Sequence, residues 1–245
     1  MTRRAELPRS RADFHSAQGV LLVTRQPPPA APPTPGQPAA VPGNPAEGVE
    51  ILVAVWDDGS VTALNGHVDL GTGIRTALAQ IVAEELDLGL ECVTMVLGTT
   101  GMAPNQGATI ASASIQVHAV PLRAAAAQAR AWLLARAAQQ FGVAVEEVES
   151  RNASVRVKTD PARKLGYGAL VRGEHVELPL APDTPTKDST QYRVVAQRFW
   201  LRSYAPRRHR SCPRHSRVQS GNVSERPRRM GTGLVALRSG LPGDG

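Results

Sequence analysis

A glycine-rich turn that leads directly into an amphipathic helix limits the possible folds of this chain more than any other part of its sequence. The turn spans residues 66–73, and apolar residues then recur at helical spacing from Ile74 to Leu86. Residues 51–64 resemble a β-hairpin closed by an Asp-Gly turn, and residues 91–97 suit a further strand. The sequence therefore predicts a strand–helix–strand unit and an α/β fold.

A second segment of small and hydroxylated residues, 109–114, leads into a long alanine-rich stretch. The pattern predicts one helix that runs to about Phe141 and stops at Gly142, with Pro121 either near its first turns or at a kink. Its many alanines indicate close packing against a neighbouring element, so the expected fold is α/β of the α+β kind. Three shorter elements are also predicted: strands at residues 20–23 and 152–158, and a short helix or turn at residues 167–171.

Both small-residue segments come just before a predicted helix, where unpaired backbone N–H groups and the helix dipole favour an anion. Two such helix starts could hold opposite sides of one polyanionic ligand. The alternative is that serine and threonine only cap the helices, which is their usual role. Glu84 and Glu85 lie toward the C-terminal end of the first helix, and we expect them to form a solvated face.

Length and composition limit the classes of protein that this chain can belong to. Its 245 residues leave room for one large domain or two small ones. No apolar stretch approaches the length of a membrane span, and no apolar run follows the basic residues 1–4 as in a signal peptide. Cys92 and Cys212 do not have metal-site spacing. We therefore expect a cytoplasmic protein with no membrane partner.

Composition divides the chain into three parts. Residues 1–48 form an N-terminal segment with nine prolines between residues 27 and 45, which is typical of an extended linker. Residues 49–197 hold the regular patterns, and residues 1–197 carry 17 Lys and Arg against 19 Asp and Glu. Residues 198–245 carry 11 arginines, no lysine and two acids, so the positive charge of the chain is concentrated in its tail.

The two small-residue segments resemble those of the molybdenum-binding large subunits of the xanthine dehydrogenase and aldehyde oxidase family, of the isoquinoline 1-oxidoreductase and nicotinate dehydrogenase type. There the first segment reads Gly-x-Val-Glu-Leu-Gly-Gln-Gly-Ile-x-Thr-Ala-Leu-Ala-Gln-Ile, matched by residues 66–81. The second reads Pro-x-x-Gly-x-Thr-x-(Gly/Ala)-Ser-x-Ser-Ile-Gln, matched by residues 104–116, and Tyr-Arg-Val-Val at residues 192–195 is also similar. The resemblance covers residues 49–197 and implies part of a molybdenum-cofactor-binding domain, from the N-terminal part of a longer subunit.

The resemblance also implies which residues contact the cofactor, a molybdenum pyranopterin (molybdopterin) in its cytosine dinucleotide form. Thr72 departs from the family, which usually has glutamine there, and Asp69 replaces the usual glutamate. The implied contacts come on one side from Leu70, Gly71, Thr72 and Gly73, and on the other from Ala111, Ser112 and Ser114.

The family reaction is the hydroxylation of an aldehyde or N-heteroaromatic compound with water as the oxygen source. A glutamate base activates a hydroxyl on molybdenum, and electrons leave through a separate 2Fe–2S subunit. That glutamate lies near the far C-terminus of the family's subunit, and nothing in this chain matches it. The resemblance therefore implies an oxidoreductase part that is inactive alone, with no catalytic residue and no metal ligand in this chain. His67 and His118 lie near the two motifs and are expected to be structural or solvated.

The arginine-rich tail, residues 198–245, leaves several interpretations open. As a binding arm it would make the chain a basic nucleic-acid or anion-binding protein, although the aromatic residues that stack on bases are scarce there. We favour a tail that is translated out of frame and disordered. A one-base shift can give Arg-Val-Asp-Ile from the codons of residues 206–210 and Leu-Asn-Val-Arg-Val from those of residues 224–229, both similar to the family's next motifs. Nucleic acid is then not a partner. A third possibility concerns the whole chain: it could be a shortened but functional cofactor-binding module that completes its site with another polypeptide.

Overall fold

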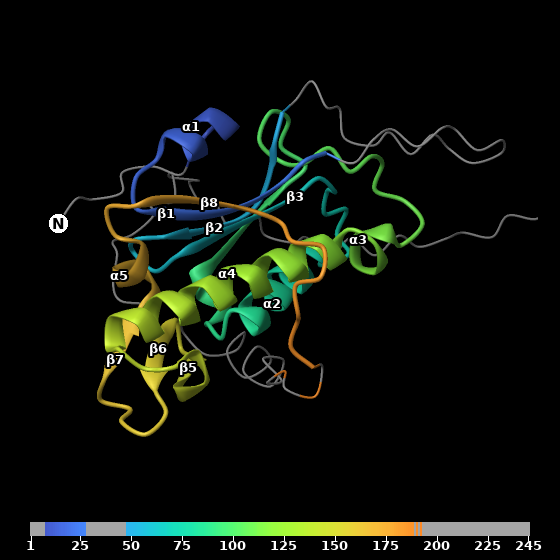
Figure 1. The fold of residues 1–245 in the computed structure, drawn as a ribbon. Helices are drawn as coiled ribbons and strands as arrows, with labels where there is room; N and C mark the ends of the chain where they lie inside the picture. Colours follow the sequence, from blue (N-terminus) through green and yellow to red (C-terminus); the bar gives the residue numbers. More distant parts are fainter. Residues whose placement is uncertain (1–7, 28–47, 189, 191, 193–245) are drawn as a thin grey trace, which may run out of the picture. The chain divides into compact units, whose positions relative to one another are not determined.

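The computed structural model describes residues 8–27, 48–188, 190 and 192 (Figure 1). Most of the predicted proline-rich linker and the whole arginine-rich tail lie outside these residues. The predictions made for those two segments therefore stay predictions.

A five-stranded mixed sheet forms the centre of the fold, in the order β4-β3-β2-β1-β8. The central pairs β1–β2 and β2–β3 are antiparallel, whereas the outer pairs β3–β4 and β1–β8 are parallel. This arrangement confirms the predicted strand at residues 20–23 and the predicted hairpin. The strands are β1 (Val20–Arg25), β2 (Glu50–Trp56), β3 (Val61–Asn65), β4 (Val93–Leu97) and β8 (His175–Pro179).

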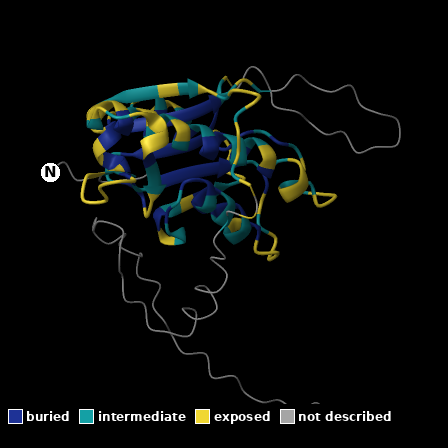
Figure 2. Cartoon of the chain, turned by 60° about the horizontal axis from the view of Figure 1, so that its bottom comes forward, coloured by how far each residue is buried: buried dark blue, intermediate teal, exposed yellow. Residues whose placement is uncertain are grey.

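Helices cover one face of this sheet, and the strand side chains alternate between that face and the other. Helices α2 (Ile74–Glu85) and α4 (Ala119–Phe141) lie along the covered face (Figure 1). On the opposite face, Phe14 of the short helix α1 (Arg11–Ser16) packs against Trp56, with ring centroids 5.6 Å apart. Two clusters of buried residues therefore lie on the two sides of the sheet, and Figure 2 shows the strands between them in the colour of buried residues.

The predicted strand–helix–strand unit is confirmed as β3, α2 and β4, because α2 connects two strands that pair in parallel. A short 3₁₀ turn, η2 (Leu90–Cys92), forms the first part of the predicted last strand. The alanine-rich helix is also confirmed, since Ala125, Ala126 and Ala129 are fully buried where α4 crosses the sheet and α2.

The long helix begins later than the sequence predicts. A separate single turn, α3 (Ala113–Gln116), precedes it. The N–H groups of Val117 and His118 both bond to the carbonyl of Ala113, which ends α3, and the carbonyl of His118 accepts a hydrogen bond from Asn65 Nδ2 at 3.4 Å. The break therefore accompanies a contact with the end of β3, which local sequence cannot reveal.

A small antiparallel sheet follows the C-terminal end of α4. Asn152 and Ala153 were predicted as strand, but their φ angles of 50° and 56° place them in the turn of a hairpin instead. The predicted short helix at residues 167–171 is confirmed. The elements are η3 (Val145–Glu147), β5 (Val148–Arg151), β6 (Ser154–Val157), β7 (Lys164–Gly166) and α5 (Tyr167–Val171).

The expectation that Glu84 and Glu85 form a solvated face is wrong for Glu85. Its side chain has 0% exposure, and Glu84 beside it is half-buried. Glu85 faces α4 and the segment after β8, which supply cations and a phenol from far along the sequence. Four groups contact its carboxylate: Arg123 Nε at 2.8 Å, Arg130 Nη1 at 3.3 Å, the Tyr192 hydroxyl at 2.6 Å and the Lys187 backbone N–H at 3.2 Å.

Replacing Gly142 with alanine is expected to lower the free energy of unfolding by about 1 kcal/mol. Gly142 ends α4 with φ 68°, a left-handed conformation that strains alanine. Urea denaturation followed by circular dichroism would measure the change. Gly166→Ala is the matched control, because Gly166 has φ −71° and an added Cβ would meet only one atom, at 4.0 Å. Equal losses in the two variants would contradict the prediction.

Candidate functional site

The two segments singled out in the sequence lie side by side at the end of β3. The first turn (residues 66–73) leaves β3, and the second turn (residues 104–114) leads into α3. Figure 1 shows α3 at the N-terminal end of α4, near the end of β3. Three consecutive residues of the first turn bond to side chains of the second: Gly66 N to Gln106 Oε1 at 2.8 Å, His67 Nδ1 to Ser114 Oγ at 2.5 Å, and Val68 N to Thr109 Oγ1 at 3.0 Å.

Gly66 is the point of closest approach between the two turns. A Cβ built on Gly66 would lie 2.0 Å from the carbonyl oxygen of Pro104 and 3.0 Å from the backbone nitrogen of Gln106. Real Cβ atoms do not approach backbone this closely. The close contact with the second turn therefore requires glycine at position 66, the first residue of the first motif.

The residues predicted to contact a cofactor form the outer edges of these turns. Leu70 is 72% exposed, and Gly71, Thr72 and Gly73 beside it are exposed as well. An added Cβ at Gly71 or Gly73 would meet no atom within 4 Å, so the space in front of them is open. Across from them, Ala111 and Ser112 are exposed and Ser114 is half-buried.

Several backbone donors of the first turn are already hydrogen-bonded within the chain. The Asp69 carboxylate accepts from the N–H groups of Gly71 at 3.0 Å, Gly73 at 3.2 Å and Arg75 at 3.2 Å. These hydrogen bonds lower the pKa of Asp69 below its ordinary value, and the bond from Arg75 has the largest effect. Asp69 thus takes the position at the start of α2 where the sequence suggested an external anion.

The second turn has backbone donors that remain open. Ala111 and Ser112 adopt positive φ angles of 52° and 55°, which costs of order 1 kcal/mol for a residue with a side chain. Among the described residues, the backbone N–H groups of Ala111 and Ser112 donate no hydrogen bond. Strained backbone that carries open donors is typical of turns that bind a ligand.

A pair of histidines lies beneath the two turns. His67 has 0% exposure, and its ring meets that of His118 edge-on with centroids 4.4 Å apart. Burial lowers the pKa of both imidazoles, and the charges of His67 and Arg25 lower that of His118 further. Of the two predicted alternatives, structural or solvated, the structural one agrees with the burial of His67, whereas His118 is half-buried; the contact between the two rings was not foreseen.

Apolar side chains surround the two turns. Within the described part of the chain, seven large hydrophobic residues are exposed, and six of them belong to the turns or to the segment that follows the second turn. An apolar patch of this kind marks a surface that contacts another molecule or another part of a protein. The six residues are Val68, Leu70, Ile110, Ile115, Val117 and Val120.

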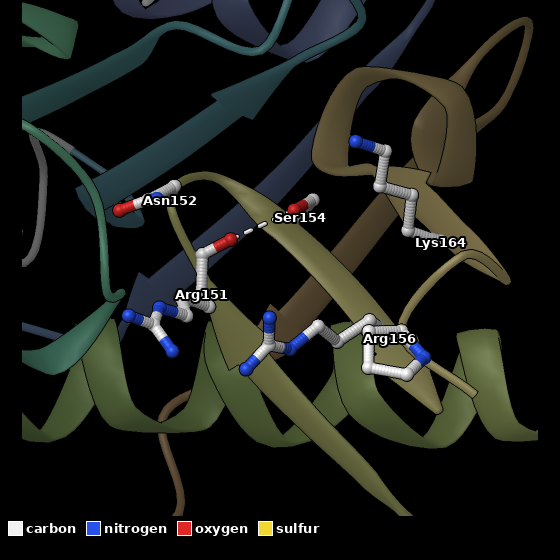
Figure 3. Close-up of a pocket in the computed structure, with 6 residues that line it drawn as sticks. Arg151, Asn152, Ser154, Arg156 and Lys164 are labelled. Atoms are coloured by element: carbon white, nitrogen blue, oxygen red, sulfur yellow. Dashed lines mark hydrogen bonds between the residues drawn. The ribbon is translucent and has the colours of Figure 1, made fainter. Parts of the chain in front are cut away.

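A separate cavity of about 220 Å³ lies on the small sheet (Figure 3). Its lining includes Arg151, Arg156 and Lys164, and Arg156 pairs with Glu149 at 2.5 Å. The 23-residue helix α4 separates this sheet from α3, a length of about 34 Å. The cavity therefore belongs to a different region from the two turns, and the sequence motifs gave no signal for it.

Within the residues that the structure describes, no helix is long and apolar enough to cross a membrane. In the same ranges, no three His, Cys, Asp or Glu side chains gather in a metal-binding arrangement.

Comparison with known proteins finds relatives among dehydrogenase subunits. The chain is 47% identical over 189 residues to a nicotinate dehydrogenase subunit of Pseudomonas putida, a match that covers 77% of this chain and 16% of that protein. It is 30% identical over 137 residues to a probable xanthine dehydrogenase subunit of Bacillus subtilis, covering 54% of this chain and 18% of that protein. The chain thus spans less than a fifth of the length of these relatives.

Among solved structures, CO dehydrogenase from Oligotropha carboxidovorans is 29% identical, with a TM-score of 0.43 over 46% of this chain and 14% of that one. A family model described as the molybdopterin cofactor-binding domain matches residues 20–220, most of the chain. The chain therefore belongs to the molybdopterin cofactor-binding domain family.

Proposed function

We propose that this chain forms one wall of the pocket for a molybdenum pyranopterin in the large subunit of a molybdenum hydroxylase. The observation that carries the proposal is the pairing of the two turns: both family motifs lie together and direct their outer edges to open space. Leu70, Gly71, Thr72 and Gly73 would contact the cofactor from one side, and Ala111, Ser112 and Ser114 from the other.

The residues present fit such a group. A pyranopterin is a flat ring system rich in nitrogen and oxygen acceptors, and the open N–H groups of Ala111 and Ser112 can donate to it. Gly71 and Gly73 allow the ring to approach the backbone because no Cβ projects into the open space. The N–H groups of Gly73 and Arg75 at the start of α2 already donate to Asp69, so an anionic part of the cofactor, including a cytosine dinucleotide, would bind at the second turn.

When bound, the cofactor would supply the oxidation chemistry by which an aldehyde or N-heteroaromatic substrate gains oxygen from water. The residues of this chain orient the cofactor, and we assign none of them a catalytic role. The two relatives above are named as subunits, so we further propose that electrons leave through a partner subunit that carries a 2Fe–2S cluster. The reaction would take place in the cytoplasm. The alternative function in nucleic-acid binding depends on residues 198–245, and no described residue favours it.

A chimera tests the proposal. The matching segment of the nicotinate dehydrogenase subunit from Pseudomonas putida is replaced by residues 49–192 of this chain, and the assembled enzyme is purified from its own host. We expect molybdenum and pterin contents close to those of the parent enzyme. Ser112→Asp should lower both to below about a tenth, because it puts a charge and added bulk against the acceptors of the cofactor.

Ser154→Asp is the matched control for that substitution. Ser154 lies beside Arg151, Arg156 and Lys164 on the small sheet, where an added carboxylate is tolerated electrostatically (Figure 3). This variant should keep its full molybdenum content. A chimera that assembles with its partners but contains no molybdenum would overturn the proposed function.

A further inference from the structure

His67 differs from its neighbours in how it joins the two turns. Gly66 and Val68 donate backbone N–H groups, whereas His67 reaches the second turn with its side chain, through Nδ1 and Ser114 Oγ at 2.5 Å. Ser114 is the half-buried member of the proposed cofactor contacts. A fully buried imidazole therefore supports, from behind, a residue of the open wall.

Two further contacts hold the residue His67. The backbone N–H of His67 donates to Asn65 Oδ1 at 3.0 Å, while Asn65 Nδ2 donates to the carbonyl of His118 at 3.4 Å. The His118 ring, which lies between α3 and α4, packs edge-on against the His67 ring. The end of β3 and the start of α4 thus fix the ring in one position, so the position of Nδ1 determines where Ser114 can lie.

We propose that His67 is the positioning residue that sets the spacing of the two turns through Ser114, and that it does so only as a neutral imidazole. This inference rests on the proposed function, since the spacing matters because a flat cofactor must fit against both turns.

The surroundings of His67 oppose a positive charge. Burial removes water from the ring, and the next titratable group is another imidazole, His118. His118 in turn faces Arg25 of β1, whose own charge is compensated by Glu50 of β2 at 2.6 Å. Ser114 and Asn65 are neutral, and a backbone hydrogen bond of Gln106, which raises the pKa of His67, is outweighed by burial. Among the described side chains, no carboxylate is hydrogen-bonded to either imidazole, so protonation of His67 would favour separation of the turns.

Amide hydrogen exchange of the full chain tests this inference without any cofactor. At pH 7.5, His67→Phe and Ser114→Ala should each speed exchange in residues 109–116 by about tenfold, because each removes the same hydrogen bond. The double variant should not be faster than either single variant, since the two residues act as one pair. His67→Asn keeps a polar group at the position of Nδ1 and should retain the slow exchange of the wild type.

Acid provides the second readout. After correction for intrinsic rates, wild-type exchange in residues 66–73 and 109–116 should rise at least threefold between pH 7.5 and pH 5, whereas that of His67→Asn should not change. Ser60→Ala, in the β2–β3 hairpin, is the control and should behave as the wild type at both pH values.

Two results would overturn the inference: additive effects of His67→Phe and Ser114→Ala, or the same acid response in wild type and His67→Asn. A purely space-filling role of His67 predicts little change in His67→Phe. Failure of the proposed function shows separately, as a chimera without molybdenum whose turns still exchange slowly.

Discussion

Glu85→Gln is expected to destabilise the protein by about 3–5 kcal/mol, the largest effect of any single substitution considered. The carboxylate of Glu85 is fully buried and compensates Arg123 and Arg130, which are 33% and 14% exposed. Without its charge, two cations remain partly buried with no equal partner, and glutamine cannot accept from all the donors that converge there. The single amide oxygen of glutamine would have to serve donors that now share two carboxylate oxygens, the Tyr192 hydroxyl among them.

Thermal unfolding and urea denaturation would measure this effect, which corresponds to a decrease in Tm of roughly 10 °C for a domain of this size. Glu149→Gln is the matched control: it removes a carboxylate from a pair with Arg156, but Glu149 is 41% exposed. An exposed pair contributes at most about 1 kcal/mol, so this variant should stay close to the wild type. Similar losses in both variants would show that Glu85 acts no differently from a surface residue.

Gly66→Ala is expected to separate the two turns and to cost about 3 kcal/mol in unfolding free energy. The new Cβ would lie 2.0 Å from a backbone carbonyl oxygen, which cannot turn aside as a flexible side chain can. Relief of the clash requires movement of the whole turn, and the bond from Gly66 N to Gln106 is then lost. In the chimera described above, we expect molybdenum content to fall at least tenfold.

Gly101→Ala distinguishes this steric effect from simple backbone strain. Gly101 has φ 79° and open space around its Cα, so alanine there is strained but meets no neighbour. We expect a loss of about 1 kcal/mol and an unchanged molybdenum content. Normal molybdenum content in Gly66→Ala would show that the spacing of the turns is not critical.

The central part of the fold could be predicted from the sequence because its signals are local. The Asp-Gly turn determines the β2–β3 hairpin, and helical periodicity from Ile74 determines α2. The separation of α3 from α4 could not be predicted, since it accompanies a contact between His118 and Asn65. Local preference favours one continuous helix there, and a tertiary hydrogen bond goes with the break.

In the candidate site, too, the features with a local sequence signal could be predicted and those that depend on tertiary contacts could not. The two motifs identified the right segments, because small residues before a helix are a local pattern. The roles of Asp69 and Glu85 were missed for different reasons. Asp69 bonds to N–H groups that the sequence assigned to a ligand. Glu85 depends on partners 38 and 107 residues away, Arg123 and Tyr192, which no periodicity connects with it.

The parallel pairing of β1 with β8 leaves one edge of β1 unpaired while the chain is being synthesised. The neighbour of strand β1 on one side, β8, is synthesised ~150 residues after β1. At about 5–20 residues per second, the outer edge of β1 remains unpaired for roughly 10–30 s. An unpaired apolar edge is a template for pairing with other chains. Rapid translation, or a chaperone that covers Val20–Arg25, should therefore increase the yield of folded protein.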